Sequence, residues 1–437
     1  MASRIVCSWG NVIRGPHELL GLNSRYDGFP NTAARTTVLP FGNGRSYGDS
    51  CLNVGGALLE TRGADRFIHF DRETGVLACE AGVLLKDILT LTVPAGWFLP
   101  VVPGTAHVTV GGAIANDVHG KNHHHVGSFG RHVRRFELLR SNGRRLSCSP
   151  TENPEYFAAT VGGLGLTGVI TWGELQLRRI PGPCLDVESI RFGHLDEFFS
   201  LCDESERDFE YTVAWIDCLG RGKHLGRGIL QRANHAPSPA KPPVAARNKS
   251  VPFALPVSLV NPLSLRVFNT VYYHRGQARR RNASEHFQGF FFPLDGIHHW
   301  NRLYGPQGFY QYQCVVPGVV GREATSDLLQ AIARSGMGSF LAVLKRFGAV
   351  PSPGMLSFPR EGVTLALDFP NKGEPLKRLF ESLDRIVTEA GGALYPAKDG
   401  RMPGALFRGG YPRWQEFKSY IDPHSSSSFW RRVTEGE

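Results

Sequence analysis

The 437-residue chain lacks the features that define several large classes of protein. It has no run of the roughly 18 apolar residues that a membrane-spanning helix requires. Residues 1–15 contain no apolar segment after their charges, so we expect no secretory signal. The eight cysteines are scattered without a C-x-x-C pair, which predicts reduced thiols and neither a zinc site nor a disulfide framework. These absences predict a protein that stays in the cytoplasm or lies on a membrane surface.

Acidic side chains are fewer than basic ones, and the formal net charge is +10. Such an excess favours an anionic partner, which could be nucleic acid, anionic lipid or a phosphorylated substrate. No zinc-finger, RNA-recognition or helix-turn-helix signature accompanies the charge, so we expect no nucleic-acid partner. A solvated loop and a phosphate-binding role explain the densest basic cluster equally well. That cluster consists of Arg275, Arg279, Arg280 and Arg281.

The pattern of residue types changes near residue 180, within a length that predicts about two to three domains. Up to there, short β-branched runs alternate with Gly, Asn and Asp turns, which predicts strands. The Asn142-Gly143 pair predicts the turn of a hairpin over Phe136–Leu146. Pro154 predicts the first residue of a helix. Further strands are expected at Thr36–Pro40 and Val169–Leu177.

Residues 181–392 predict a second domain of mixed helices and strands. Apolar residues share one face over Pro375–Ala390 and Gly391 follows, which predicts a helix. The proline- and arginine-rich residues 237–285 predict a mobile loop, whose interrupted apolar part could lie on a membrane without crossing it. We expect residues 393–437 to return to the first domain. The other expected elements are strands at Gln311–Val316 and Val363–Phe369 and a helix at Ser326–Arg334.

Glycine-rich segments are the most informative feature of the chain. The segment Val102–His124 combines glycines and hydrogen-bonding side chains without a helical period, which suits a backbone wrapped around a flat polar ligand. The segment Phe41–Asp49 follows a predicted strand and could form either an anion-binding nest or a tight structural turn. Gly163–Gly168 matches G-x-G-x-x-G, but it follows a helix and precedes a strand. This order is the reverse of a dinucleotide-binding fold, so we exclude one.

Polar side chains elsewhere suggest a ligand more weakly. His119, His123, His124 and His125 could suggest a metal, but no carboxylate or cysteine cluster completes a ligand set, so we expect none. Strand alternation places Gln311 and Gln313 on one face, where they could hold sugar hydroxyls or lie exposed on an edge strand.

Taken in order, these motifs resemble the vanillyl-alcohol-oxidase-like FAD enzymes, and most of all the decaprenylphosphoryl-β-D-ribose 2′-oxidases among them. The resemblance runs from about Val38 to the C-terminus. It implies an α+β protein with a PCMH-type two-part FAD-binding domain (1–180), a cap domain with an antiparallel sheet (181–392) and a returning C-terminal segment (393–437). Besides the glycine segments, it rests on Trp300–Pro306, Phe309–Gln313, Leu344–Gly348 and Tyr395–Asp399.

The resemblance implies FAD that is bound without a covalent link. Arg45 stands where many relatives carry the histidine that attaches the flavin, and no cysteine stands where doubly attached relatives carry one. The residues implied to contact FAD are Gly42, Asn43, Gly44, Arg45, Ser46, Tyr47, Gly48, Asp49, Pro103, Gly104, Thr105, Thr109, Gly111, Gly112, Ala115, Asn116, His119, Gly120, Lys121, Asn122, Val169 and Tyr395.

The implied reaction is oxidation of the 2′-hydroxyl of a polyprenyl-phosphoryl-β-D-ribofuranose to the 2′-keto sugar. An NADH-dependent reductase of the short-chain dehydrogenase type would complete the epimerisation to the arabinose donor, and a quinone or O₂ would accept the electrons. Lys398 and Lys345 are implied near the reacting hydroxyl, with Tyr47 and His119 beside them. The implied substrate-binding residues are Tyr304, Gln311, Gln313, Thr364 and Asp368.

Two departures from the family pattern leave alternatives open. Ala366 stands where mycobacterial members carry a cysteine, so nitroaromatic inhibitors that trap that thiol should find no covalent target. Thr364 replaces an asparagine, which bears on the identity of the substrate. A soluble sugar, alditol or aldonolactone oxidase that uses O₂ is the second hypothesis, and a non-catalytic flavin-binding relative is the third.

Overall fold

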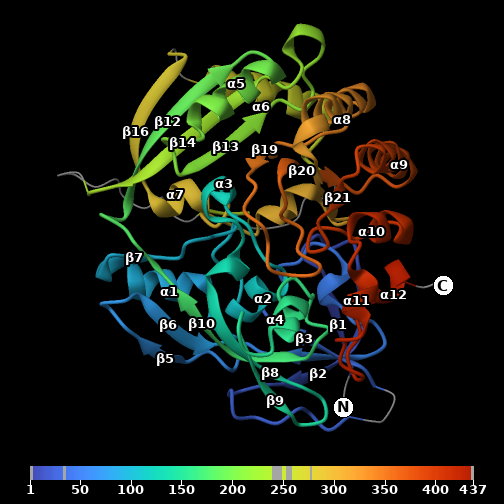
Figure 1. The fold of residues 1–437 in the computed structure, drawn as a ribbon. Coiled ribbons are helices and arrows are strands. Elements are labelled where there is room, and N and C mark those ends of the chain that lie inside the picture. Colours follow the sequence, from blue (N-terminus) through green and yellow to red (C-terminus); the bar gives the residue numbers. More distant parts are fainter. Residues whose placement is uncertain (1–2, 33–35, 239–248, 252–257, 276–277, 435–437) are drawn as a thin grey trace.

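The computed structural model describes residues 3–32, 36–238, 249–251, 258–275 and 278–434 (Figure 1). Its first part contains a four-stranded sheet in the order β1-β2-β4-β3, in which β2 and β3 run parallel to β4. The buried Val38 and Leu39 place β3 inside, so that the chain leaves this strand directly into the segment Phe41–Asp49. The strands are β1 (Arg4–Cys7), β2 (Arg14–Gly21), β3 (Val38–Phe41) and β4 (Ala57–Glu60).

A five-stranded antiparallel sheet completes the first part in the order β5-β6-β10-β8-β9. The expected hairpin is confirmed, since β8 and β9 pair on either side of Asn142 and Gly143, and Gly143 takes a left-handed φ of 81°. The strands are β5 (Phe67–Phe70), β6 (Val76–Glu80), β8 (Val133–Leu139), β9 (Arg145–Cys148) and β10 (Val169–Gln176), and β7 (Trp97–Phe98) pairs with β11 (Arg178–Arg179). The helices are α1 (Leu85–Thr92), α2 (Val110–Ala115), α3 (His123–Val126) and α4 (Pro154–Thr160).

The second part is built on an eight-stranded sheet in the order β16-β12-β14-β13-β19-β20-β18-β21. Its strands are β12 (Cys184–Phe192), β13 (Tyr211–Ile216), β14 (Gly228–Ala236), β16 (Arg280–His286), β18 (Phe309–Val316), β19 (Ala342–Phe347), β20 (Gly362–Pro370) and β21 (Ala393–Leu394). The helices α5 (Leu195–Ser205), α8 (Gly321–Ser335) and α9 (Glu374–Glu389) pack on this sheet. The apolar face expected for α9 is buried there, with Leu379, Phe380 and Leu383 in the core.

The expected mobile loop over residues 237–285 is wrong wherever the structure describes regular elements. Helix α6 (Pro262–His274) starts with a capping box, in which the Asn261 side chain accepts the N–H of Ser264 at 3.1 Å. Strand β16 pairs with β12 along seven residues. The physical reason is that a capped helix and an edge strand tolerate the surrounding prolines and arginines. The rest of the expected loop lies in 239–248, 252–257 and 276–277, outside the described residues.

None of the described helices is long and apolar enough to cross a membrane. Three further short elements lie in the second part of the chain. They are β15 (Lys249–Ser250), α7 (Phe287–Phe291) and β17 (Ile297–His298).

The C-terminal residues contact both parts. Strand β21 is the edge of the eight-stranded sheet, and the chain then runs back beside the first sheet (Figure 1). There the N–H of Val38 donates to the carbonyl of His424 at 2.7 Å, and Arg432 pairs with Asp49 at 2.7 Å and with Asp399 at 2.9 Å. These contacts hold the loop around Lys398 against the loop around Tyr47. The helices are α10 (Gly404–Gly410), α11 (Trp414–Lys418) and α12 (Ser428–Thr434).

Candidate active site

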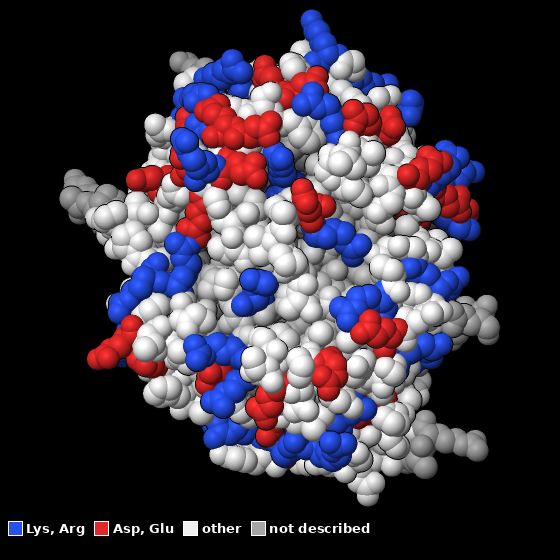
Figure 2. All heavy atoms as spheres, viewed as in Figure 1, with Lys and Arg blue, Asp and Glu red and all other residues white. Residues whose placement is uncertain are grey.

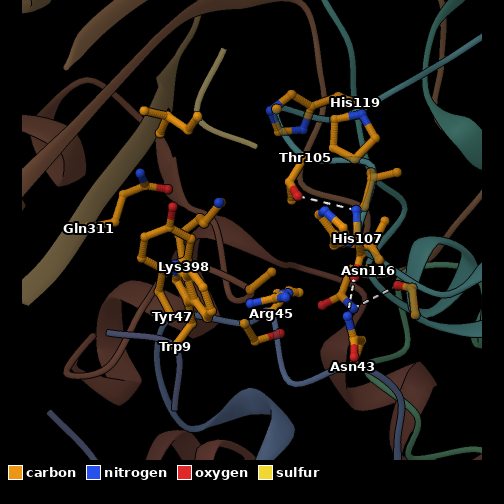
Figure 3. A pocket seen from close by; sticks show the side chains of 18 of the residues that line it. Trp9, Asn43, Arg45, Tyr47, Thr105, His107, Asn116, His119, Gln311 and Lys398 are labelled. Atoms are coloured by element: carbon orange, nitrogen blue, oxygen red, sulfur yellow. Dashed lines mark hydrogen bonds between the residues drawn. The ribbon is translucent and has the colours of Figure 1, made fainter. Parts of the chain in front are cut away.

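A cavity of about 620 Å³ lies between the two parts of the chain. The segments after β3 and around α2 form one wall, and strands β13, β18, β19 and β20 form the other. Figure 3 shows Asn43, Thr105, His107 and Asn116 on one side of this space, and Tyr47, Gln311 and Lys398 on the other.

The wall formed by the segments after β3 and around α2, which we call the glycine wall, offers main-chain donors. The N–H groups of residues 43–46 donate no hydrogen bond within the described part of the chain. The side chain of Asn43 joins the two glycine segments by donating to the carbonyl of His107 at 2.7 Å (Figure 3). A Cβ built on Gly104 would meet no atom within 4 Å, because the cavity lies there. A row of free N–H groups in such a loop is an anion-binding nest.

Close packing supports this wall from behind. A Cβ on Gly42 would lie 2.5 Å from Oγ1 of Thr109, so only glycine fits. Thr109 is the N-cap of α2, and its Oγ1 accepts the N–H of Gly112 at 3.1 Å. Tyr395 lines the cavity and donates to the carbonyl of Asn116 at 2.9 Å, which ties α2 to the C-terminal segment.

Strand alternation builds the opposite wall. Gln311 and Gln313 of β18 both line the cavity, which confirms that they share one face. Gln311 lies opposite Asp368 of β20 in the strand register, and Lys345 of β19 lies opposite Thr364. Residues of the other parity, such as Tyr312, face α9 instead, where Tyr312 donates to Asp384 at 3.1 Å.

A buried polar cluster lies at one end of this wall. The amide nitrogen of Gln311 donates to Oδ1 of Asp368 at 2.6 Å, and the Tyr304 hydroxyl donates to Oδ2 at 3.5 Å. Lys398 Nζ lies 3.9 Å from the centre of the Tyr47 ring (Figure 3). Burial raises the pKa of Asp368 and lowers the pKa of Lys398, while their mutual attraction opposes both shifts. Lys398 therefore reaches its neutral form at a lower pH than an exposed lysine does.

His119 lies at the other end of the cavity, and its imidazole ring is neutral. Burial, and then the Lys345 cation, lower its pKa well below the ordinary value. Nε2 of His119 lies 2.9 Å from the amide nitrogen of Gln313, which can only donate, so the ring carries its hydrogen on Nδ1. Nδ1 is buried and has no partner among the described residues. Such a donor in a cavity wall can be satisfied by an acceptor on a bound cofactor.

Two further lysines line the cavity close to His119. Lys345 donates to the carbonyl of Gly120 at 3.3 Å, and burial lowers its pKa to about 8. Lys121 donates to the carbonyl of Phe290 at 2.5 Å, and burial lowers its pKa to about 7. Both lysines therefore carry less positive charge near neutral pH than exposed lysines do.

Six expected site residues do not line the cavity, because they pack against or pair with other parts of the chain. Tyr304 and Thr364 support it from behind, since they contact Asp368 and Gln313. Asp49 pairs with Arg432. The others are Gly48, packed on Asp399, Asn122, which donates to Pro100, and Val169, buried between the lining residues Gly168 and Ile170.

Sequence reasoning missed part of the lining. Trp9 reaches the cavity from the turn after β1. Asp295 lines the cavity and accepts the N–H of Ala106 at 2.8 Å. A tryptophan near the N-terminus and a lone aspartate give no local signal. The only available signal was the nearby motif that begins at Trp300, which also lines the cavity.

The histidine-rich segment serves packing in this structure. His123 packs on Phe347 with ring centres 4.4 Å apart, and His124 bonds to the carbonyl of Phe209 at 3.1 Å. Among the described residues, no group of three or more His, Cys, Asp or Glu side chains could hold a metal ion.

The free N–H groups, the glycine wall and the unpaired Nδ1 of His119 fit a flavin cofactor. A family model described as an FAD binding domain matches residues 31–149. The protein is an FAD-dependent oxidoreductase of α+β architecture, with a PCMH-type FAD-binding domain.

Comparison along the whole chain narrows this class. The chain is 38% identical over 400 residues to decaprenylphosphoryl-beta-D-ribose oxidase of Mycolicibacterium smegmatis, which covers 88% of this chain and 86% of that protein. It belongs to the decaprenylphosphoryl-β-D-ribose oxidase family. The resemblance seen in the motifs and the expectation of FAD are thereby confirmed.

The chain is also similar to other proteins. An uncharacterized protein of Streptomyces coelicolor is 38% identical over 363 residues, which covers 78% of this chain and 97% of that protein. Cytokinin dehydrogenase 8 of Oryza sativa is 31% identical over 159 residues, 34% of this chain and 30% of that protein. The likeness to the plant enzyme thus covers a limited part of each chain.

Proposed function

We propose that this protein oxidises the 2′-hydroxyl of a polyprenyl-phosphoryl-β-D-ribofuranose to the 2′-keto sugar, with FAD bound non-covalently. The observation that carries the proposal is the 88% coverage by a relative named for its action on decaprenylphosphoryl-ribose. The buried cluster of Lys398, Asp368 and Gln311 across the cavity from the glycine wall supports it, because oxidation of an alcohol requires a proton acceptor and groups that orient hydroxyls.

Each wall has its own part in this reaction. FAD, when bound, would supply the acceptor for the hydride that leaves the carbinol carbon. The N–H groups of residues 43–46 would hold its pyrophosphate, and His119 would meet the flavin ring. Neutral Lys398 takes the hydroxyl proton, while Gln311 and Gln313 orient the sugar. Residues 1–180 then act as the FAD-binding domain. Residues 181–392 act as the cap, and its strands form the substrate wall, the cavity wall opposite the glycine wall.

The product requires partners. A 2′-keto sugar becomes the arabinose epimer only through hydride return, which an NADH-dependent reductase of the short-chain dehydrogenase type would supply. A quinone or O₂ would accept the two electrons taken from the sugar. A polyprenyl substrate resides in a bilayer, so we place the protein at a membrane surface. The exposed Leu263, Val267 and Val271 of α6 are compatible with that position.

Anaerobic titration of the purified protein with polyprenyl-phosphoryl-β-D-ribose tests the proposal. We expect the absorbance band of the oxidised flavin to disappear. After reoxidation and acid precipitation, we expect the yellow colour in the supernatant, because Arg45 cannot form the histidyl link. Retention of colour in the pellet would contradict non-covalent binding. A flavin reduced by free sugars or alditols but not by this substrate, with release of hydrogen peroxide, would replace the proposal by a soluble sugar oxidase.

A further inference from the structure

Arg45 lies in the cavity wall, and one N–H of its guanidinium group is unsatisfied. Its Nε is buried and has no hydrogen-bond partner among the described residues. No described carboxylate lies within 4.0 Å of it. Asp295 attracts it from farther away, and Oδ2 of Asp295 accepts the N–H of Ala106 at 2.8 Å. A partly buried cation without a partner is costly, which indicates that an anion completes it.

The orientation of the group is already set. The guanidinium carbon lies 4.1 Å from the centre of the Trp9 ring, so the planar group stacks on the indole. Such a plane presents parallel N–H donors, and these match two oxygens of a phosphate. Figure 3 shows Arg45 beside Tyr47 and below Lys398, at the reacting end of the cavity. An anion at Arg45 would therefore lie next to the groups that handle the hydroxyl proton.

Two other lysines of the cavity, and the arginines at the edge of the eight-stranded sheet, are less suited to bind this anion. Lys121 and Lys345 donate to main-chain carbonyls, and burial lowers the pKa of each. Two arginines at the start of β16 have acidic partners on the outer sheet edge, where Figure 2 shows basic and acidic side chains interleaved. Arg279 pairs with Glu197 at 3.4 Å, and Arg280 pairs with Glu188 at 3.5 Å. Among the described lining residues, Arg45 is the only arginine.

We propose that Arg45 binds the phosphate of the substrate and selects phosphorylated ribofuranosides over neutral sugars, with Trp9 holding the guanidinium plane. The inference rests on the proposed function. In that substrate the phosphate is carried on C1, and C1 is the direct neighbour of C2, the carbon that is oxidised. The phosphate must therefore lie beside Lys398 and Tyr47, where Arg45 is. Arg45 thus stands where many relatives carry the histidine that attaches the flavin, and here it binds the substrate.

The test compares Arg45→Gln and Arg45→Lys with Arg179→Gln in the FAD-loaded enzyme. Arg179 is the matched control, because its guanidinium also stacks on a tryptophan, 4.2 Å from the Trp97 ring, but lies outside the cavity. Two ligands are used, a short-chain alkyl-phosphoryl-β-D-ribofuranoside and the neutral alkyl β-D-ribofuranoside. Binding is followed by the change in the flavin spectrum, and KM and kcat are followed by flavin reduction.

For Arg45→Gln we expect the Kd and KM of the phosphorylated ligand to rise roughly 10- to 150-fold, the worth of one charged hydrogen-bonded pair. Arg45→Lys should show a smaller rise, because it keeps the charge and loses the planar fork. Binding of the neutral riboside should not change in either variant, and Arg179→Gln should bind both ligands as the wild type does.

Two outcomes would overturn the inference. The first is an unchanged Kd for the phosphorylated ligand in Arg45→Gln. The second is a reduced FAD content with unchanged KM once FAD is restored, which would assign Arg45 to the cofactor. Failure of the proposed function is separate, because the wild-type flavin would then stay oxidised while the binding titration still reports on Arg45.

Discussion

Replacing Lys398 with alanine is expected to abolish reduction of the flavin by the substrate while FAD stays bound. Lys398 is the buried amine of the Asp368–Gln311 cluster, and its lowered pKa makes the neutral base accessible. A positioned general base contributes about 10²- to 10⁴-fold to the rate, so we expect a loss of at least that order. Rapid mixing of the oxidised enzyme with substrate under anaerobic conditions measures the rate, and absorbance measures the FAD content.

Lys377→Ala is the control for this substitution, because Lys377 lies exposed on α9 and pairs only loosely with Glu374, at 3.8 Å. It should reduce flavin at the wild-type rate. Unchanged turnover in Lys398→Ala would remove this lysine from the mechanism. The next residue to replace would then be Lys345, the other buried lysine on the substrate wall.

The pH dependence of flavin reduction should rise with pH in the wild type, because the base acts in its neutral form. Burial lowers the pKa of Lys398, so the rise should lie below the value of about 10.4 for a free lysine. The Asp368 carboxylate raises the pKa of Lys398. Asp368→Asn should therefore move the rise to lower pH. A shift to higher pH, or none, would show that Asp368 does not act on the base.

Gly48→Ala is expected to destabilise the enzyme and impair catalysis together. A Cβ on Gly48 would lie 1.6 Å from the carbonyl oxygen of Asp399, the residue after Lys398. The obstacle is main chain, which cannot rotate away, so the two loops must separate. Tyr47 is held to Ala397 by a main-chain hydrogen bond of 2.9 Å, and that contact would be lost with them. Overpacking of this kind costs about 1–3 kcal/mol.

Thermal unfolding of the FAD-loaded protein and the rate of flavin reduction measure this prediction. Gly409→Ala is the matched control, because a Cβ on that residue of α10 meets no atom within 4 Å. It should keep the melting temperature and the rate. A Gly48→Ala protein that melts and reacts like the wild type would show that the contact between the two loops is not needed.

Much of the local structure follows from sequence. Strand β18 and helix α9 were expected within one or two residues of their bounds, because period-2 and period-3.6 patterns depend only on neighbouring side chains. Helix α6 was not expected, because the prolines around it are typical of loops. The Asn261-Pro262 pair is nevertheless a local helix start signal, and the structure uses it.

The site was predicted less evenly. Gln311, Gln313, Lys345, Lys398 and most of the glycine segments line the cavity. These residues were identified from the order of the motifs along the chain, because no local sequence pattern predicts that Lys398 lies beside Tyr47. Asp49 was expected on the cofactor, and in the structure its carboxylate pairs with Arg432, which is almost at the other end of the chain. A carboxylate inside a glycine turn gives no sign of whether its partner is a ligand or a distant arginine.

The sequence by itself determined the glycine segments, the faces of the strands and the family, because each depends on residue type in order along the chain. Only the tertiary structure decided which charges are paired and which are free. Arg279 and Arg45 are the same residue type in the sequence. In the structure Arg279 pairs with Glu197, whereas Arg45 has no carboxylate within 4.0 Å among the described residues. Burial and pairing depend on what the fold brings together across hundreds of residues, and those neighbours set the pKa of Lys398 and the free guanidinium of Arg45.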